Sequence, residues 1–175
     1  LIDNTGMSEI SLKIIKEMLI DRGYTINDHQ SSDYDLYAEN KSKRLLCFFS
    51  KEDKLKIQEA KEKLYIMNQN EVKRAIIVYQ NDITPSAKKS FETLHNYHIE
   101  LFSLKELQFN PTTHRLVPKH ELVISEQEKE ELKEYQGKLP SILYNDIIRR
   151  YYDFSKGDII RIIRKNNQIV YRVVK

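Results

Sequence analysis

The sequence is poor in the residues that break or cross-link a chain. Its 175 residues include only four glycines, four prolines and one cysteine, with no tryptophan. So few glycines and prolines exclude a long flexible linker, and a lone cysteine excludes an internal disulfide. No apolar run approaches the roughly 20 residues of a membrane span, and residues 1–4 lack the basic start of a secretory signal. The remaining composition, 40% hydrophobic and 31% charged, is that of an ordinary globular protein, so we expect no membrane association.

Motifs of the common catalytic and cofactor sites are also missing. There is no phosphate-binding glycine loop, dinucleotide fingerprint, H-E-x-x-H pair or nucleophile elbow. His114 and His120 have no cysteine nearby and lack the spacing of a zinc site; we expect them to fix an extended segment by hydrogen bonds. The glutamates between residues 126 and 134 alternate with lysines, as on a solvated helix face. We therefore expect no catalytic residue, no metal and no cofactor.

The charge is distributed unevenly along the chain. Residues 1–110 carry 16 Lys and Arg against 17 Asp and Glu, whereas residues 136–175 carry 9 against 3. The net charge of +3 is weak for a protein that binds nucleic acid by itself. This pattern is typical of a protein held mainly by protein contacts, with any contact to nucleic acid being local.

The first part of the chain alternates between helical and strand-like patterns. Apolar runs without helical periodicity predict buried strands, and Cys47 within one of them is expected to be a small core residue. Ser50 with Asp53 resembles a capping box, and Thr84 followed by Pro85 is a helix start. The expected order is a helix over 8–22 closed by Gly23, a strand over 45–49, a helix over 50–68, a strand over 74–79, a helix from Thr84, a strand over 97–102 and a short helix over 103–107. Such alternation predicts an α/β domain over residues 1–109, with a mixed sheet.

Residues 110–113 (Asn-Pro-Thr-Thr) interrupt this alternation and predict a domain boundary between 1–109 and 110–175. Ser125 begins a second capping box. The elements expected in the second domain are a strand over 121–124, a helix over 125–135, a short helix over 145–152 and a hairpin of 158–164 and 168–174. The fold class is therefore α/β (α+β), with a small C-terminal α/β domain that ends in a β-hairpin.

The expected hairpin has a consequence for charge. With Asn166-Asn167 as a two-residue turn, Arg161 lies directly across from Arg172. Like charges that face each other across a strand pair are unfavourable. Either the two side chains splay apart into solvent, or the carboxylates of a partner neutralise this face on assembly.

Two blocks of sequence carry a family resemblance. The first begins with His114-Arg115-Leu116-Val117-Pro118-Lys119-His120 and continues through Leu139-Pro140, an Asp-x-x-x-Arg-Tyr segment from Asp146, Lys156-Gly157 and Ile159–Arg164. In this order and spacing it resembles the assembly domain of subunit 5 of eukaryotic multisubunit RNA polymerases, a domain shared with the archaeal counterpart of that subunit. The second block, Arg74–Gln80 followed by Thr84–Lys88, is similar to the end of the N-terminal jaw domain of the eukaryotic subunit.

The resemblance implies a non-catalytic subunit of a DNA-dependent RNA polymerase. Its partners would be the largest subunit, on which the assembly domain docks, other polymerase subunits, and downstream double-stranded DNA near the jaw domain. The residues implied to lie near DNA are Thr84, Pro85, Ser86, Lys88 and Lys89. The residues implied at the subunit interface are His114, Leu116, Val117, Pro118, His120, Pro140, Asp146, Arg150, Tyr151, Gly157, Arg161, Arg164, Tyr171 and Arg172.

The chain also departs from the family pattern. Ile147 stands where the family usually has proline, Ser141 where it usually has arginine, and the loop at Lys165–Gln168 is shorter than expected. These departures, with many Lys, Asn and Ile residues, favour a homologue from a large DNA virus, located in the infected cytoplasm and the virion. A cellular homologue would be nuclear. Two other classes stay open at this point: a free-standing nucleic-acid-binding protein and a nuclease-like enzyme.

Overall fold

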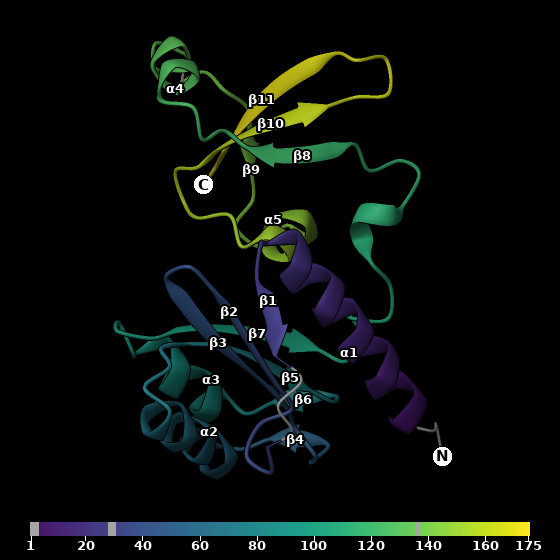
Figure 1. Cartoon of the computed structure of the whole chain (residues 1–175), viewed down its shortest axis with the longest axis vertical. Coiled ribbons are helices and arrows are strands. Elements are labelled where there is room, and N and C mark those ends of the chain that lie inside the picture. Colours follow the sequence, from purple (N-terminus) through teal and green to yellow (C-terminus); the bar gives the residue numbers. More distant parts are fainter. Residues whose placement is uncertain (1–3, 28–30, 136) are drawn as a thin grey trace. The chain divides into compact units, whose positions relative to one another are not determined.

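The computed structural model describes residues 4–27, 31–135 and 137–175 (Figure 1). The chain divides into two compact units, Leu1–Phe109 (unit 1) and Asn110–Lys175 (unit 2). None of the helices in the described residues is both long and apolar enough to cross a membrane.

Unit 1 is built on a five-stranded mixed sheet with the strand order β1-β2-β3-β5-β7. Strands β1, β2 and β3 pair antiparallel, whereas β3, β5 and β7 pair parallel, and β4 and β6 form a separate parallel pair. The strands are Thr25–Asn27 (β1), Leu36–Asn40 (β2), Lys43–Phe49 (β3), Lys54–Leu55 (β4), Arg74–Tyr79 (β5), Asp82–Ile83 (β6) and His98–Ser103 (β7). The α/β class, the mixed sheet and strands β3, β5 and β7 are confirmed, while the other four strands were not predicted.

Helix α1 (Asn4–Asp21) begins four residues before the predicted start and ends as predicted at Gly23. Gly23 has φ +79° and donates to the Ile20 carbonyl at 2.8 Å, while the Tyr24 N–H donates to the Leu19 carbonyl at 2.9 Å. These two bonds form a Schellman motif, which requires a left-handed residue where glycine is favoured.

Helices α2 (Ile57–Gln69) and α3 (Pro85–Glu92) precede β5 and β7 respectively. The predicted start of α2 at Ser50 is wrong, because Lys54 and Leu55 pair with β6 and the helix begins only at Ile57. The Ser50 hydroxyl does not cap a helix; it donates to the Glu59 carboxylate at 2.9 Å. The predicted short helix at 103–107 is a turn, held by Ser103 and Glu106.

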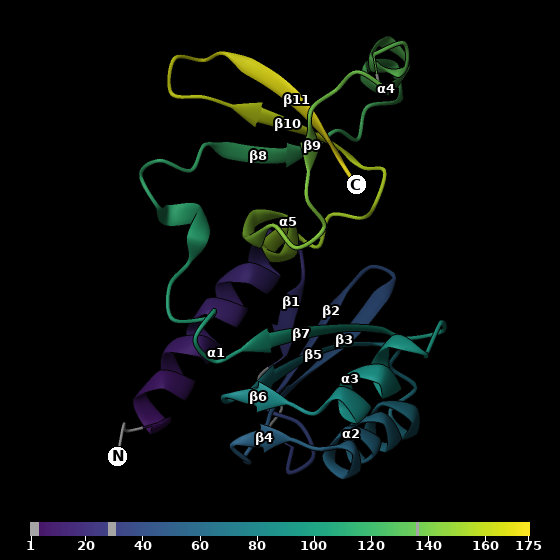
Figure 2. The same ribbon diagram turned by 180° about the vertical axis from the view of Figure 1, so that it is seen from behind.

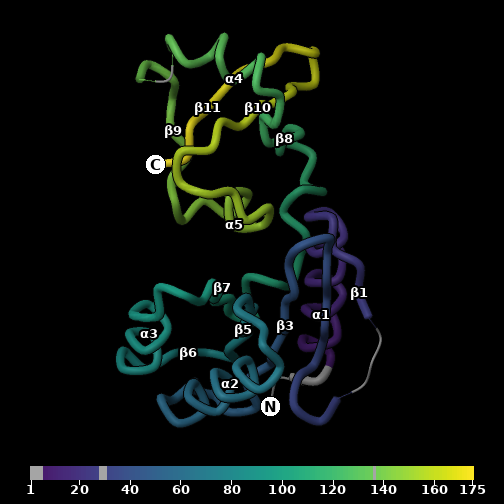
Figure 3. Tube along the Cα trace, turned by 60° about the vertical axis from the view of Figure 1, so that its left-hand side comes forward, coloured from purple at the N-terminus to yellow at the C-terminus, as the bar shows by residue number. Residues whose placement is uncertain are grey.

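Both faces of the unit 1 sheet are covered, α2 and α3 lying on one side and α1 on the other (Figure 3). One core cluster joins alternate residues of β3 and β5 to the two helices: Leu46, Phe48, Ala75 and Ile77 with Ala60, Met67, Ala87 and Phe91. Cys47 points to the other face and is fully buried, which raises the pKa of its thiol well above the usual range. Its predicted role as a core residue is confirmed.

Unit 2 holds a four-stranded sheet in the order β8-β10-β11-β9, of which β8, β10 and β11 are best seen in Figure 2. Strands β8 and β11 pair antiparallel with β10, and the two-residue strand β9 pairs parallel with β11. The elements are η1 (Pro111–Thr113), β8 (Lys119–Leu122), α4 (Glu126–Lys133), β9 (Ser141–Ile142), α5 (Ile147–Tyr152), β10 (Ile159–Ile163) and β11 (Ile169–Val174). The strand expected at 121–124 therefore lies two residues earlier, at 119–122.

The terminal hairpin is confirmed, but its predicted register is wrong by one residue. Ile163 pairs with Ile169, and the Arg164 N–H donates to the Gln168 carbonyl, so the loop has three residues with Asn167 at φ +58°. Arg161 consequently faces Tyr171, and Arg172 faces Ile160. Since side chains alternate between the faces of a strand, Arg161 and Arg172 lie on opposite faces of the sheet.

Candidate functional site

One face of the unit 2 sheet carries a groove of about 260 Å³. The segment before β8 forms one wall, and β8, β10 and β11 contribute side chains to it. Seven residues that the sequence predicted for the subunit interface line this groove: Leu116, Val117, Pro118, His120, Asp146, Arg164 and Arg172. The structure thus brings together half of the predicted interface residues around one concave surface.

The groove has an apolar interior and an open lip. Ile142, Ile148 and Ile162 lie within it and are 5–6% exposed, because they also belong to the apolar interior of unit 2. Leu116 at the edge of the groove is 74% exposed. Leu116 and the three isoleucines therefore give the groove an apolar lining that reaches its solvent-exposed edge.

Two histidines hold the segment that forms the groove wall. His114 Nδ1 accepts from the Leu116 N–H at 3.3 Å, and His120 Nδ1 lies 2.8 Å from the Pro118 carbonyl oxygen. Since a carbonyl only accepts, His120 Nδ1 carries the proton of that bond. Burial lowers the pKa of His120, so its neutral form is favoured. The predicted hydrogen-bonding role of both histidines is confirmed.

Charge at the groove is unequal. Asp146 is committed to helix α5, since its carboxylate accepts from the N–H groups of Ile148 and Arg149 at 2.8 and 3.2 Å. Among the described residues, the Arg164 guanidinium bonds only the neutral amide oxygen of Gln168, at 3.4 Å. In the described part of the chain, neither Arg164 nor Arg172 has a carboxylate within ion-pair distance. The groove therefore presents two guanidinium groups that form no ion pair with a carboxylate of the described residues, although Asp146 also lines it.

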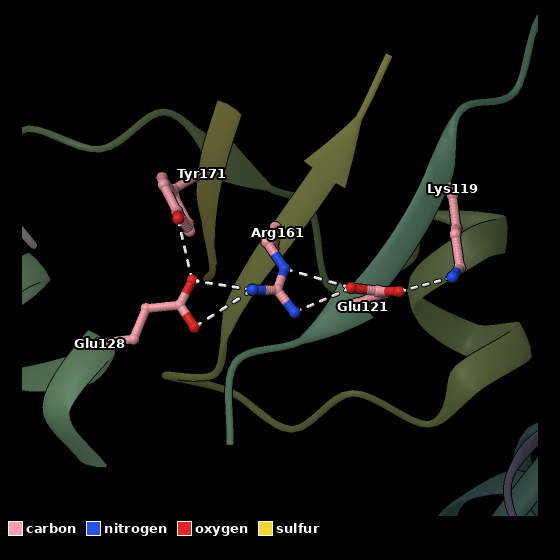
Figure 4. Close-up of polar contacts among 5 residues, drawn as sticks. All are labelled: Lys119, Glu121, Glu128, Arg161 and Tyr171. Carbon is pink, nitrogen blue, oxygen red and sulfur yellow. Dashed lines mark hydrogen bonds and ion pairs between the residues drawn. The ribbon is translucent and has the colours of Figure 1, made fainter. Parts of the chain in front are cut away.

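The opposite face of the same sheet is electrostatically satisfied (Figure 4). Arg161 binds Glu121 of β8 at 2.9 and 3.1 Å and Glu128 of α4 at 3.2 and 3.3 Å. The Tyr171 hydroxyl donates to Glu128 at 2.8 Å, and Lys119 lies 2.7 Å from Glu121. Lys119 and then Arg161 lower the pKa of Glu121, and the bond to Glu121 raises the pKa of Arg161.

This network corrects two interpretations of the sequence. Arg161 does not oppose Arg172, so the proposed like-charge pair that a partner would neutralise does not exist. Glu128 is not a solvated member of the glutamate series, because it turns toward the sheet, whereas Glu126 and Glu130 pair with Lys129 and Lys133 on the exposed helix. Arg161 and Tyr171 are thus held inside unit 2 by its own carboxylates.

The remaining predicted interface residues lie away from the groove lining. Tyr151 is 3% exposed and accepts from the Asn110 side chain at 3.0 Å, which ties α5 to the start of unit 2. The Pro140 carbonyl accepts from the Val173 N–H at 3.0 Å, and Gly157 lines a separate depression. Arg150 lies in α5, where its N–H donates to the carbonyl of the capping residue Asp146 at 2.9 Å. Arg149 was not among the predicted residues. Its side chain is 7% exposed, its guanidinium carbon lies 3.8 Å from the centre of the Tyr144 ring, and its Nε–H donates to the Phe154 carbonyl.

In unit 1, the residues predicted near DNA surround the N-terminus of α3. Thr84 caps the helix by accepting from the Ala87 N–H at 3.3 Å, and Pro85 has no N–H. The Lys88 N–H is bonded to the Thr84 carbonyl, so Ser86 retains the one first-turn N–H without a described partner. The side chains of Lys88 and Lys89 are exposed, with Glu92 at 3.9 Å from Lys88. The Ser86 hydroxyl already donates to the Thr84 hydroxyl oxygen at 3.3 Å, so this end offers the Ser86 backbone N–H and two exposed ammonium groups.

A depression of about 870 Å³ in unit 1 contains carboxylates that could suggest a nuclease. Two of these carboxylates are already engaged: Asp35 accepts from the Phe49 N–H at 2.6 Å, and Glu59 binds the Ser50 hydroxyl and Lys63 at 2.8–2.9 Å. Lys63 also lies 5.5 Å from the centre of the Phe48 ring. These contacts favour a structural role in the core.

Comparisons with known proteins place these surfaces in context. Residues 109–174 match the family described as RNA polymerase Rpb5, C-terminal domain. The chain is 32% identical over 184 residues to DNA-directed RNA polymerases I, II, and III subunit rpabc1 of Dictyostelium discoideum, with 92% of this chain and 93% of that protein covered. It is 34% identical over 173 residues to the RPABC1 subunit of Caenorhabditis briggsae, with 93% and 82% covered. RNA polymerase V subunit 5A of Arabidopsis thaliana is 27% identical over 170 residues, with 83% and 76% covered.

Proposed function

This chain belongs to the Rpb5 family of DNA-directed RNA polymerase subunits and is a non-catalytic component of such an enzyme, and on that premise we propose how its two units act. Unit 2 is the assembly domain, which docks on the largest polymerase subunit. Unit 1 is the jaw domain, which helps to hold downstream duplex DNA during transcription. The names of the Dictyostelium and Caenorhabditis relatives attach those proteins to polymerases I, II and III together.

The observation that carries the docking proposal is the groove of unit 2. It combines a buried apolar floor with the exposed Leu116 and with Arg164 and Arg172, which have no carboxylate partner in the described part of the chain. An apolar floor beside guanidinium groups without an ion pair is typical of a binding surface for another protein, whereas Glu121 and Glu128 already neutralise the face around Arg161. The groove is therefore the part of unit 2 that gains most from a protein partner.

Co-purification tests this assignment. A tagged full-length chain is expected to bring down the very large subunits of a polymerase, in equal molar amount, from cells in which it is expressed with them. The isolated chain is expected to bind duplex DNA only weakly at physiological salt, since its net charge is only +3. Recovery of the chain without any polymerase subunit, together with tight DNA binding, would instead establish the free-standing nucleic-acid-binding protein.

The DNA contact near α3 rests on Ser86, Lys88 and Lys89. Each phosphate contact releases counterions, so a lost contact lowers the salt slope of DNA affinity by about 0.9. Replacing both lysines by alanine in the assembled enzyme is expected to flatten this slope without changing subunit content. Replacement of Lys61 and Lys73, which are exposed outside α3, is the matched control. An unchanged slope in the Lys88 and Lys89 variant would refute the DNA contact.

The departures at Ile147, Ser141 and the short hairpin loop support a viral origin for the chain. On this proposal the polymerase works in the cytoplasm of the infected cell and is packaged in the virion. Antibody staining of infected cells and of purified virions tests it, and staining confined to the nuclei of uninfected cells would contradict it.

A further inference from the structure

Strand β8 forms an edge of the unit 2 sheet that the described part of the chain leaves without a neighbour. The Val123 N–H donates to the Ile159 carbonyl at 3.0 Å, so residues 119, 121 and 123 direct their backbone groups toward β10. The N–H and C=O groups of His120 and Leu122 must then point away from β10, along the open edge. These groups can bond a further strand.

The open edge is protected only in part against such pairing, by the four-residue length of β8 and by Lys119 at its start. Native sheets usually guard an edge with prolines, inward charges or a covering loop. Pro118 guards only the beginning of β8, while Leu122 and Ile124 farther along are 39% and 77% exposed. The edge thus offers hydrogen bonds and apolar side chains together, which is how sheets receive an added strand from a partner.

The groove continues from this edge, since His120 contributes its backbone to the edge and its side chain to the groove lining. At about 260 Å³ the groove is smaller than the roughly 300–1,000 Å³ of small-molecule pockets, and it suits one or two apolar side chains. Arg164 and Arg172 also line the groove, and neither forms an ion pair with a carboxylate of the described residues. Phosphates need no buried apolar floor, so these features together favour an acidic peptide over nucleic acid.

We infer that an extended segment of a polymerase partner, with an apolar residue flanked by Asp or Glu, pairs with the β8 edge at His120 and fills this groove. The apolar side chain covers Ile142, Ile148 and Ile162, and the acidic side chains bind Arg164 and Arg172. This inference rests on the proposed function and adds the chemistry of the segment that unit 2 recognises.

The test uses the full chain within the assembled polymerase. A photo-crosslinking amino acid replaces Leu116 at the groove, and in a control it replaces Lys165, which is exposed on the hairpin loop outside the groove lining. The Leu116 position is expected to crosslink to a polymerase subunit, and mass spectrometry of the joined peptide is expected to find an apolar residue with Asp or Glu beside it. Crosslinking to nucleic acid, or to a segment without acidic residues, would overturn the inference.

Charge reversal gives a second measurement. Arg164→Glu with Arg172→Glu is expected to weaken incorporation into the enzyme by at least about tenfold, because like charges at an interface repel. Lys156→Glu with Lys165→Glu makes the same change of charge outside the groove and is expected to incorporate normally. Circular dichroism checks that both variants fold. Normal incorporation of the groove variant refutes the inference alone, whereas failure of the wild-type chain to co-purify with polymerase refutes the proposed function itself.

Discussion

The two units of the chain use arginine–carboxylate pairs at different depths. In unit 1, Arg22 at the end of α1 binds both oxygens of Glu100 on β7 at 2.8 Å, and the two side chains are only 4% and 12% exposed. In unit 2, Arg161 binds two carboxylates, yet its side chain is 32% exposed. Water screens the second arrangement and hardly reaches the first. We therefore expect burial, more than the number of partners, to decide how much such a pair contributes to the stability of the fold.

A third group of arginines completes the comparison. Arg164 and Arg172 have no carboxylate partner in the residues that the structure describes. Their loss removes no internal ion pair, so it should leave folding intact and affect only recognition. On the proposed docking, the chain contains arginines for the core, for the surface of the fold and for a partner, and substitutions can separate the three roles.

The largest effect on folding is expected from Arg22→Met. The substitution leaves Glu100 buried without its guanidinium group, and breaking a buried pair in this way costs about 3–5 kcal/mol. Urea denaturation of the full chain, followed by hydrogen exchange in β7, measures the loss. Lys54→Met is the control, since it breaks an exposed pair with Asp82 at 2.8 Å and should leave the midpoint unchanged. Equal midpoints for both variants would show that the depth of the pair has no importance.

A smaller effect is expected from Arg161→Met. The exposed network around Arg161 is screened by salt, so the difference from wild type should shrink between about 0.1 and 1 M NaCl, whereas that of Arg22→Met should persist. Hydrogen exchange in β10 of the full chain at the two salt concentrations measures this contrast. If Arg161→Met lowered protection equally at both salt concentrations, the Arg161 network would behave like the buried Arg22–Glu100 pair. The proposed difference between exposed and buried pairs would then be wrong.

The hairpin register shows why the sequence alone predicted the elements better than their side-chain contacts. Residues 159–163 read Ile-Ile-Arg-Ile-Ile, which has apolar residues on both faces, so no period-two pattern selects one register. The pair Asn166-Asn167 tolerates left-handed backbone at either position, and only Asn167 adopts it. A two-residue and a three-residue loop were therefore equally compatible with the sequence, and the error moved Arg172 to the wrong face.

Long-range contacts explain the other differences. Thr84-Pro85 and Gly23 act within a few residues, and both were predicted correctly. Ser50 resembled a helix cap, but pairing of β4 with β6 moved the helix start to Ile57. Arg22 and Glu100 are 78 positions apart, and no local pattern marks two such residues as partners. The sequence predicted seven of the residues that line the groove, but not that they surround one concave surface, since the shape of that surface depends on the register of three strands.

The smallest expected effect is a pH dependence at His120, which lines the groove together with Asp146 and Arg172. Burial lowers the pKa of His120 below the ordinary value of 6.5. As the pH falls, His120 therefore becomes protonated more readily in the unfolded chain than in the folded chain. Unit 2 should keep its full stability above about pH 6.5 and lose part of it as the pH falls toward the lower, folded pKa.

His120→Gln should remove this dependence. Hydrogen exchange in β8 and β10 at about pH 7.5 and 5.5, corrected for the intrinsic exchange rate and with β3 and β5 as internal controls, measures it. If wild type and variant lose protection equally on acidification, another group titrates, and His120 serves only to hold the Pro118 carbonyl.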